Sequence, residues 1–426
     1  MVFRQAGKTF IIRKCLNEKG YNNVEFNLLK QPKIIEILET SSSVDDLVLK
    51  LSLYSEQKII PYETIIFFDE IQKYKEIVTK IKFLVEDKRF RYVLSCSLLG
   101  VEITNLKSAP VGYLQTITMY PLDFEEFLQV FNISGEIKKV IKSSFIERKT
   151  VDSLIHDKLM EIFRLYLIIG GMPVAVQKYV ETGNIDDVII EHQSIIEQYK
   201  LDFTQYEEDN KKIQLSYIYE MITSELNEKN KRFKISDIDK NIRLEKVESS
   251  FTWLIKAGVA LPIYNVTEPL IPLKLNEKQS LFKLFLSDVG LLTTMYGKAT
   301  KFKVISKDKD INFGSVFENF AAQELIAQGF KGCYHQSKKY GELDFVIEYN
   351  GEVLPIEIKS GKDYEKHSAL NNVMRLPNNY IKQSFVFTDY NVQVNDNIIY
   401  YPIYMLMFIL KDDFEIKIPN FRSLSF

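Results

Sequence analysis

The sequence predicts an α/β protein with several domains, and three observations carry this prediction. Short apolar runs alternate with helical periodicity near the start, long helices follow Pro121, and alternating strands return in the last third. With 426 residues, 46% of them hydrophobic, the chain can bury more than one core. We therefore expect a doubly wound α/β domain, a helical middle region and a second α/β domain, in that order.

Charge and cysteine content narrow the class of protein. Charged residues make up 26% of the chain and the net charge is −2, so any basic groove for nucleic acid must be local. Cys15, Cys96 and Cys333 lack the paired spacing of a zinc site or a disulfide framework. The sequence shows no run of about 20 apolar residues. We expect a cytoplasmic protein without a membrane partner.

The elements of the first domain follow from hydrophobic periodicity. Apolar residues recur at helical spacing over residues 9–20, which predicts a helix that Gly20 ends. Residues 64–68 form an almost wholly apolar, β-rich run, as in a central parallel strand. A helix over residues 73–86 and a strand over residues 92–94 follow. This alternation is typical of doubly wound α/β proteins.

The strongest motif lies at the start of the chain, where Gly7, Lys8 and Thr9 match the second half of the phosphate-binding pattern G-x-x-x-x-G-K-[ST]. In such a loop, backbone N–H groups and a helix N-terminus face the phosphates, the lysine reaches the β- and γ-phosphates, and the hydroxyl binds Mg²⁺. Asp69, at the end of an apolar strand, is suited to hold the same Mg²⁺, and Glu70 to activate the attacking water. We therefore predict ATP and Mg²⁺ as cofactors of this site.

Further residues complete or weaken the predicted nucleotide site. Ser95 or Ser97 would sense the γ-phosphate from the end of the next strand, and Ser97 is the residue we assign. An acidic pair after an apolar strand is also common as a solvated strand end, but the joint order of the motifs favours a nucleotide site. Val2 stands where the pattern has its first glycine, and a left-handed backbone there would cost about 1–2 kcal/mol. We expect an N-terminally truncated first domain that lacks its first strand and binds nucleotide weakly or not at all.

The middle of the chain is predicted to be helical and then mixed. Helices over residues 213–226, 235–242 and 245–257, followed by strands within 260–285, suggest a winged-helix module. The helix over residues 245–257 carries mixed charge rather than a basic face. A role in the protein core is therefore favoured over DNA reading for that helix.

The last third contains a predicted hairpin with facing carboxylates. Asn350-Gly351 between alternating runs is a strong hairpin motif, and a two-residue turn there sets Asp344 opposite Glu357. Lys359 lies on the same face as Glu357. Facing carboxylates destabilise a strand pair unless something neutralises them, and a divalent cation with oxygen ligands would do so.

We predict a metal site formed by Asp344, Glu357 and, from a preceding helix, Glu318, with Lys359 as a catalytic residue that stabilises developing charge. The arrangement is the D-(x)n-E-x-K constellation of metal-dependent phosphodiesterases. The alternative is a solvent-facing strand pair in which Lys359 offsets two acids.

Together these motifs resemble a large prokaryotic family of AAA-type ATP-binding proteins. The resemblance implies a P-loop NTPase domain followed by a C-terminal domain of unknown function with a restriction-endonuclease-like α/β fold. The motifs that carry it are residues 4–9, 67–72, 120–127, 170–173, 288–292, Glu318, 342–345 and 356–359.

The predicted domains are an ATP-binding domain over residues 1–130, a helical lid over 131–210, a winged-helix-like module over 211–300 and a PD-(D/E)xK nuclease-like domain over 301–426. The predicted function is a Mg²⁺-dependent ATPase switch coupled to a nuclease-like, DNA-contacting domain. The alternative is a non-catalytic DNA-binding or protein-interaction module in which both sites are degenerate. Candidate partners are ATP, DNA and a second copy of the chain.

Overall fold

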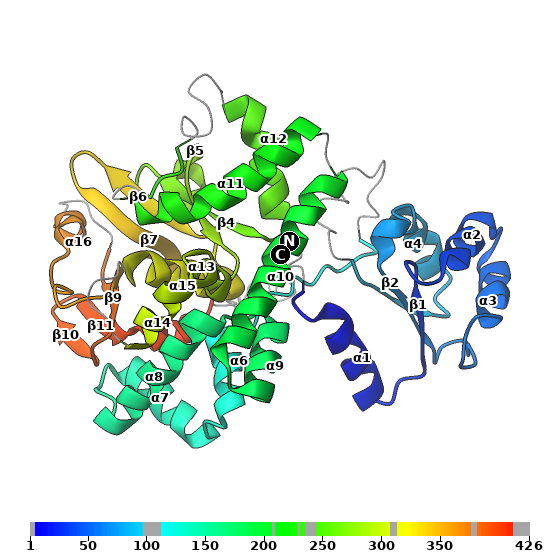
Figure 1. Ribbon diagram of the computed structural model, residues 1–426, viewed down its shortest axis with the longest axis horizontal. Helices are drawn as coiled ribbons and strands as arrows, with labels where there is room; N and C mark the ends of the chain where they lie inside the picture. Colours follow the sequence, from blue (N-terminus) through cyan, green and yellow to red (C-terminus); the bar gives the residue numbers. More distant parts are fainter. Residues whose placement is uncertain are drawn as a thin grey trace, which may run out of the picture. The chain divides into compact units, whose positions relative to one another are not determined.

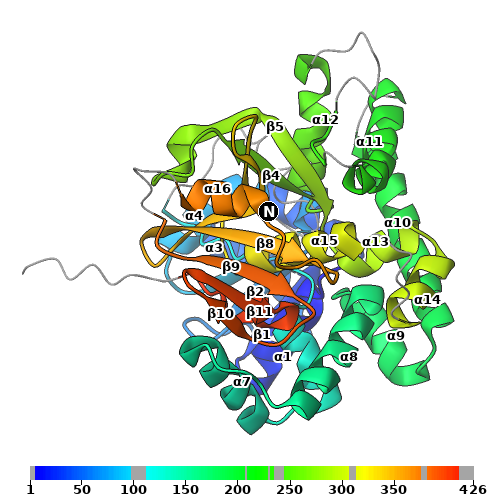
Figure 2. The same ribbon diagram turned by 90° about the vertical axis from the view of Figure 1, so that its left-hand side faces the viewer.

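The computed structural model describes residues 5–96, 112–206, 209–228, 231–234, 244–306, 313–375 and 381–411 (Figures 1 and 2). The chain divides into two compact units. Unit 1 comprises Met1–Phe131, Arg164–Pro262 and Lys283–Asn312, and unit 2 comprises Asn132–Phe163, Ile263–Phe282 and Phe313–Phe426. Each unit is thus assembled from separate stretches of chain, which differs from the consecutive domains expected from the sequence.

Unit 1 contains a parallel sheet in the order β1-β2-β3. Its strands are β1 (Asn23–Asn27), β2 (Ile65–Asp69) and β3 (Arg91–Leu94). Every residue of β2 is buried, as the apolar run predicts for a central strand. The strands expected over residues 64–68 and 92–94 are therefore confirmed, whereas β1 was not predicted.

Alternation along β2 places its side chains in two separate cores. Ile66 and Phe68 face α2 (Pro32–Thr40), α3 (Val44–Ser52) and α4 (Ile77–Glu86). The two other apolar residues of the strand, Ile65 and Phe67, pack with Leu16 of α1 (Lys8–Glu18). Figure 1 shows α1 on one side of the sheet and α2, α3 and α4 on the other. The first domain is thus wound on both faces, and α1 is held where the predicted phosphate loop enters it.

The rest of unit 1 is mainly helical. A capping box formed by Asp123 and Glu126 begins α6 (Phe124–Leu128). The other helices are α9 (Pro173–Thr182), α10 (Ile185–Tyr206), α11 (Asp209–Asn227), α12 (Leu244–Lys256), α13 (Val289–Met295) and α14 (Lys298–Ser306). The helix expected over residues 235–242 lies outside the described residues.

An eight-stranded sheet runs in the order β10-β11-β9-β8-β7-β6-β4-β5. Its strands are β4 (Ala260–Val266), β5 (Glu277–Leu286), β6 (Cys333–Ser337), β7 (Gly341–Tyr349), β8 (Glu352–Lys359), β9 (Ser384–Thr388), β10 (Gln393–Asn395) and β11 (Ile398–Pro402). Figure 2 shows β8, β9, β11 and β10 side by side. The helices of this part are α7 (Gly135–Glu147), α15 (Phe313–Ala327) and α16 (Ser368–Met374).

The strands expected to form a wing, β4 and β5, lie at one edge of this large sheet, where β4 pairs in parallel with β6. Backbone hydrogen bonds therefore join them to the strands of the last third of the chain. The structure does not support a separate winged-helix module in the described residues.

The hairpin between β7 and β8 has the predicted register. Asn350 and Gly351 both adopt positive φ, at 51° and 74°, as a two-residue turn of this kind requires. The strands pair Tyr349 with Glu352, and the same register continues to Phe345 and Ile356. One further step along both strands sets Asp344 opposite Glu357.

No single helix within the described ranges is both long and apolar enough to cross a membrane. In the same ranges, α8 (Ser153–Ile169) and α9 pass that test of length and composition together, as a pair bent by 117°.

Candidate functional site

The predicted phosphate loop leads directly into α1. Gly7 is the N-cap of this helix and has left-handed backbone angles (φ 76°, ψ 17°), a conformation that glycine adopts without steric cost. No side chain caps the helix N-terminus, and Ile11 donates its backbone N–H to the Gly7 carbonyl oxygen at 3.0 Å. The first-turn N–H groups of α1 face its N-terminus, the geometry that binds anions in phosphate sites at helix N-termini.

Thr9 and Asp69 lie together although 60 residues separate them. The Thr9 hydroxyl donates to the two Asp69 carboxylate oxygens at 3.2 and 3.4 Å. Asp69 ends the buried strand β2 and is 2% exposed, and the Asn27 side-chain amide donates to it at 3.1 Å. A hydroxyl and a carboxylate at this spacing fit Mg²⁺, which uses one or two protein carboxylates together with substrate phosphates.

Glu70 has an unusual backbone. Its φ of 59° and ψ of 41° are left-handed, which costs a residue other than glycine about 1–3 kcal/mol and occurs preferentially at functional sites. The Gln72 side-chain amide donates to the Glu70 carboxylate and holds it beside the cavity described below. This conformation turns Glu70 away from the path of β2.

Ser95 follows β3 and is buried, with its backbone N–H bonded to the Phe68 carbonyl at 2.9 Å. Its carbonyl oxygen accepts the Ile71 N–H at 3.1 Å, so this residue is fixed between the ends of β2 and β3. Ser97, the residue assigned from the sequence, lies outside the described residues. Of the two candidate serines, Ser95 is the one that lines the cavity.

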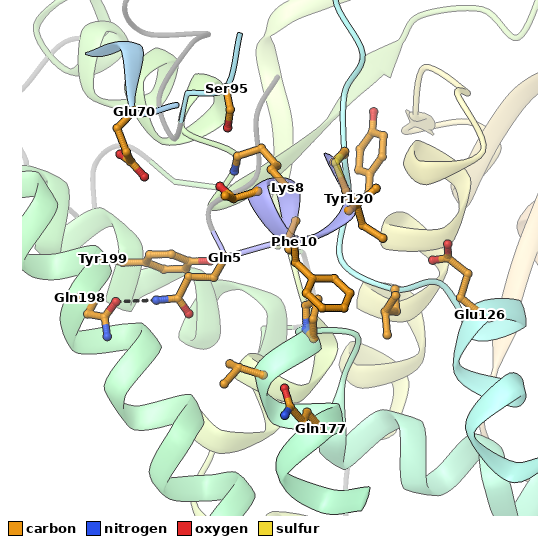
Figure 3. Close-up of a pocket in the computed structure, with 18 of the residues that line it drawn as sticks. Gln5, Lys8, Phe10, Glu70, Ser95, Tyr120, Glu126, Gln177, Gln198 and Tyr199 are labelled. Atoms are coloured by element: carbon orange, nitrogen blue, oxygen red, sulfur yellow. Dashed lines mark hydrogen bonds between the residues drawn. The ribbon is translucent and has the colours of Figure 1, made fainter. Parts of the chain in front are cut away.

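A cavity of about 850 Å³ in unit 1 brings these residues together. In Figure 3, Lys8, Glu70 and Ser95 lie toward one end, Phe10 is next, and Gln177 is at the other end. The lining residues are Gln5, Ala6, Gly7, Lys8, Thr9, Phe10, Ile11, Glu70, Ser95, Met119, Tyr120, Leu122, Glu126, Pro173, Val174, Gln177, Gln198, Tyr199 and Asp202. The volume falls within the range of about 300–1,000 Å³ that ligand pockets occupy.

The wall contributed by α9 and α10 was not predicted. Pro173, the first residue of α9, lies so close to Gly7 that a Cβ on that glycine would be 3.6 Å from the proline ring. Gln198 of α10 accepts a hydrogen bond from the Gln5 side-chain amide. The motif at residues 170–173 was recognised in the sequence, but nothing in it indicated contact with the phosphate loop.

The predicted carboxylate cluster of unit 2 is also assembled. The Lys359 ammonium lies 3.1 Å from a Glu357 carboxylate oxygen, and the Ile358 backbone N–H donates to Asp344 at 2.9 Å. Burial, and then the neighbouring Asp344, raise the pKa of Glu357 well above its usual value. Burial lowers the pKa of Lys359, but the attraction of Glu357, Asp344 and Glu318 outweighs it and the net shift is upward. Lys359 thus partly neutralises the facing acids.

The structure gives limited support to a metal at this cluster. Within the described ranges, no group of three or more His, Cys, Asp or Glu side chains is placed to hold a metal ion. Glu318 is buried on α15 and acts electrostatically on Lys359. The metal-binding roles of Glu318, Asp344 and Glu357 therefore stay predictions.

Three family models match consecutive parts of the chain. Residues 3–128 match an AAA domain, residues 160–301 a domain of unknown function (DUF8612), and residues 313–406 another domain of unknown function (DUF4143). A comparison with curated proteins gives no match. Among solved structures, the chain is similar to a Walker-type ATPase of Pyrococcus abyssi, at 14% identity over 69% of this chain and 89% of that chain, with a TM-score of 0.39.

The first match supports the main prediction from the sequence: the chain is a mixed α/β protein with a P-loop ATPase-like domain at residues 3–128. The second match runs across residue 210, where the sequence suggested a boundary between two regions.

Proposed function

We propose that the chain is a Mg²⁺-dependent ATPase whose nucleotide occupies the cavity of unit 1. The observation that carries this proposal is the 3.2 Å contact between Thr9 and Asp69, beside a cavity that Lys8, Glu70 and Ser95 also line. Residues from three separate segments thus converge on one place with the chemistry that triphosphate hydrolysis needs.

Each residue has a distinct task in this proposal. The first-turn N–H groups of α1 and the Lys8 ammonium would bind the β- and γ-phosphates, and Thr9 and Asp69 would hold Mg²⁺ between them. Glu70, held by Gln72, would orient and polarise the attacking water. Bound Mg²⁺ would neutralise charge that develops on the phosphates.

ATP titration and phosphate release on the full chain test the proposal. Glu70→Gln should abolish turnover and spare ATP binding, because the amide keeps the shape of the carboxylate and loses its basicity. Glu63→Gln is the matched control, since Glu63 is exposed just before β2. Unchanged turnover in Glu70→Gln would remove Glu70 from the scheme, and no binding at millimolar Mg²⁺-ATP would overturn the assignment.

A second candidate function belongs to unit 2, and the hairpin register favours it. Asp344, Glu357 and Lys359 are the residues a metal-dependent, nuclease-like site would use, with Glu318 as a further ligand. In this proposal ATP turnover would regulate contact between the C-terminal domain and DNA. Mg²⁺- or Mn²⁺-dependent nicking of plasmid DNA, lost in Asp344→Ala, would support it. Absence of nicking with intact ATP turnover would instead favour a non-catalytic binding module.

A further inference from the structure

Three backbone segments approach each other closely next to the cavity, which Leu122 also lines. We call this place the glycine junction; it consists of Leu122, Gly170, Gly171, Asp288 and Gly290. A Cβ on Gly171 would lie 2.9 Å from both the nitrogen and the carbonyl carbon of Leu122, and closer still to its oxygen. A Cβ on Gly290 would lie 2.6 Å from the Gly170 nitrogen. Only glycine fits at these places, because any side chain would force the backbones apart.

Hydrogen bonds fix the glycine junction. Asp288 accepts the Gly171 backbone N–H at 2.6 Å and, as the N-cap of α13, the Leu291 N–H at 2.9 Å. Leu122 donates its N–H to the Gly171 carbonyl oxygen at 2.7 Å. Asp288 is fully buried, and burial raises the pKa of its carboxyl group. The Gly171 segment is therefore held from both sides.

Lys301 of α14 also stabilises the glycine junction, through hydrogen bonds to residues of α13 and α8. Its ammonium, 1% exposed, donates to the Gly290 carbonyl oxygen at 2.9 Å, to the Thr293 hydroxyl at 3.0 Å and to the Ile168 carbonyl oxygen at the end of α8. His192 of α10 lies 3.4 Å from it; its Nε2 donates to the Ile169 carbonyl oxygen at 2.9 Å, and its Nδ1 lies 2.8 Å from the Thr294 hydroxyl. The lysine thus ties the end of α8, which leads into Gly170, to the start of α13.

These contacts form a continuous path to the phosphate loop. Asp288 holds Gly171; two residues later, Pro173 packs against Gly7. Leu122, paired with Gly171, also lines the cavity. We propose that Asp288 and Lys301 are positioning residues for the nucleotide site, which they affect by fixing the segment from Gly170 to Pro173 against the phosphate loop. This inference rests on the ATPase function proposed above.

Steady-state ATP hydrolysis by the full chain tests this role. Lys301→Met keeps the length of the side chain and removes its donors, so we expect KM for ATP to rise about ten-fold while kcat changes less than about two-fold. Lys298→Met is the matched control: Lys298 lies on the same helix, is exposed, and its 2.6 Å ion pair with the exposed Asp186 is of the solvated kind that contributes at most about 1 kcal/mol. Its KM should stay at the wild-type value.

The split between KM and kcat separates positioning from simple loss of folded protein. A partly unfolded sample loses apparent kcat in proportion to its folded fraction and keeps its KM, so that pattern in Lys301→Met would overturn the inference. Asp288→Asn should raise KM as well, because an amide offers one acceptor oxygen where the carboxylate offers two.

A double-mutant cycle with Pro173→Ala completes the test. If Lys301 acts through Pro173, its substitution should raise KM much less in the Pro173→Ala background than in the wild type. Fully additive effects would overturn the proposed path. Failure of the wild type itself to bind ATP would be a different result, since it would remove the ATPase proposal and not the positioning step alone.

Discussion

Substitution of Gly171 by alanine offers a direct test of the glycine junction. The added Cβ would lie 2.9 Å from two backbone atoms of Leu122, a distance that real Cβ contacts essentially never show, so one segment must move. Overpacking of this kind costs about 1–3 kcal/mol, and the Leu122 to Gly171 hydrogen bond contributes about 1 kcal/mol more. We therefore expect Gly171→Ala to lower the free energy of unfolding of unit 1 by about 2–4 kcal/mol.

Urea unfolding followed by tryptophan fluorescence would measure this change. Trp253, the single tryptophan, is buried in unit 1 and packs against Phe203 with ring centroids 5.3 Å apart, so its emission reports on this unit. Gly20→Ala is the control, because Gly20 has a φ of 65° and no atom within 4 Å of an added Cβ. That variant should lose only the conformational cost of about 1–2 kcal/mol. Equal stability of the two variants would refute the argument from steric overlap.

The remaining predictions concern the cavity and its surroundings. Thr9→Ala removes the hydroxyl beside Asp69, so it should weaken ATP binding about ten-fold in the presence of Mg²⁺ and little in its absence. Equal losses of affinity in calorimetric titrations with and without the metal would contradict this. Phe10 is 67% exposed and lines the cavity, where its ring can contact the base of ATP. Phe10→Ala should therefore weaken binding of ATP several-fold and leave binding of inorganic tripolyphosphate unchanged. A similar loss of affinity for both ligands would exclude a contact with the base. Burial lowers the pKa of Lys301 from 10.5 to about 7, so between these values the unfolded chain binds one more proton than the folded chain. The free energy of unfolding should accordingly rise with pH in that window by up to about 1.4 kcal/mol per pH unit relative to Lys301→Met. A pH-independent difference between the two urea-unfolding series would contradict the lowered pKa of Lys301.

Sequence reasoning succeeded where chemistry or local geometry fixes the answer. The Asn350-Gly351 turn sets the hairpin register because only two residues link the strands, and the observed pairing follows it. Thr9 and Asp69 were expected to meet because one Mg²⁺ needs both groups, although they are distant in sequence.

Long-range packing explains what the sequence did not reveal. β1 was missed because its five residues, Asn23–Asn27, alternate polar and apolar side chains over too short a run to stand out. The Asp288 to Gly171 bond spans 117 positions, and no local pattern indicates it. The wing was predicted from β4 and β5 alone, whereas pairing of β4 with β6 decides their place in the sheet.

The interleaved course of the chain bears on how it can be synthesised and divided. A polypeptide cut after residue 130 would lose Tyr166, whose ring packs 5.0 Å from Phe127 and whose hydroxyl donates to the Leu122 carbonyl oxygen. Its last helix would then expose aromatic surface to water and to other chains. Translation must likewise pass α14 before the first unit has all its parts. The first unit therefore completes its core only after residues far beyond position 131 have been synthesised.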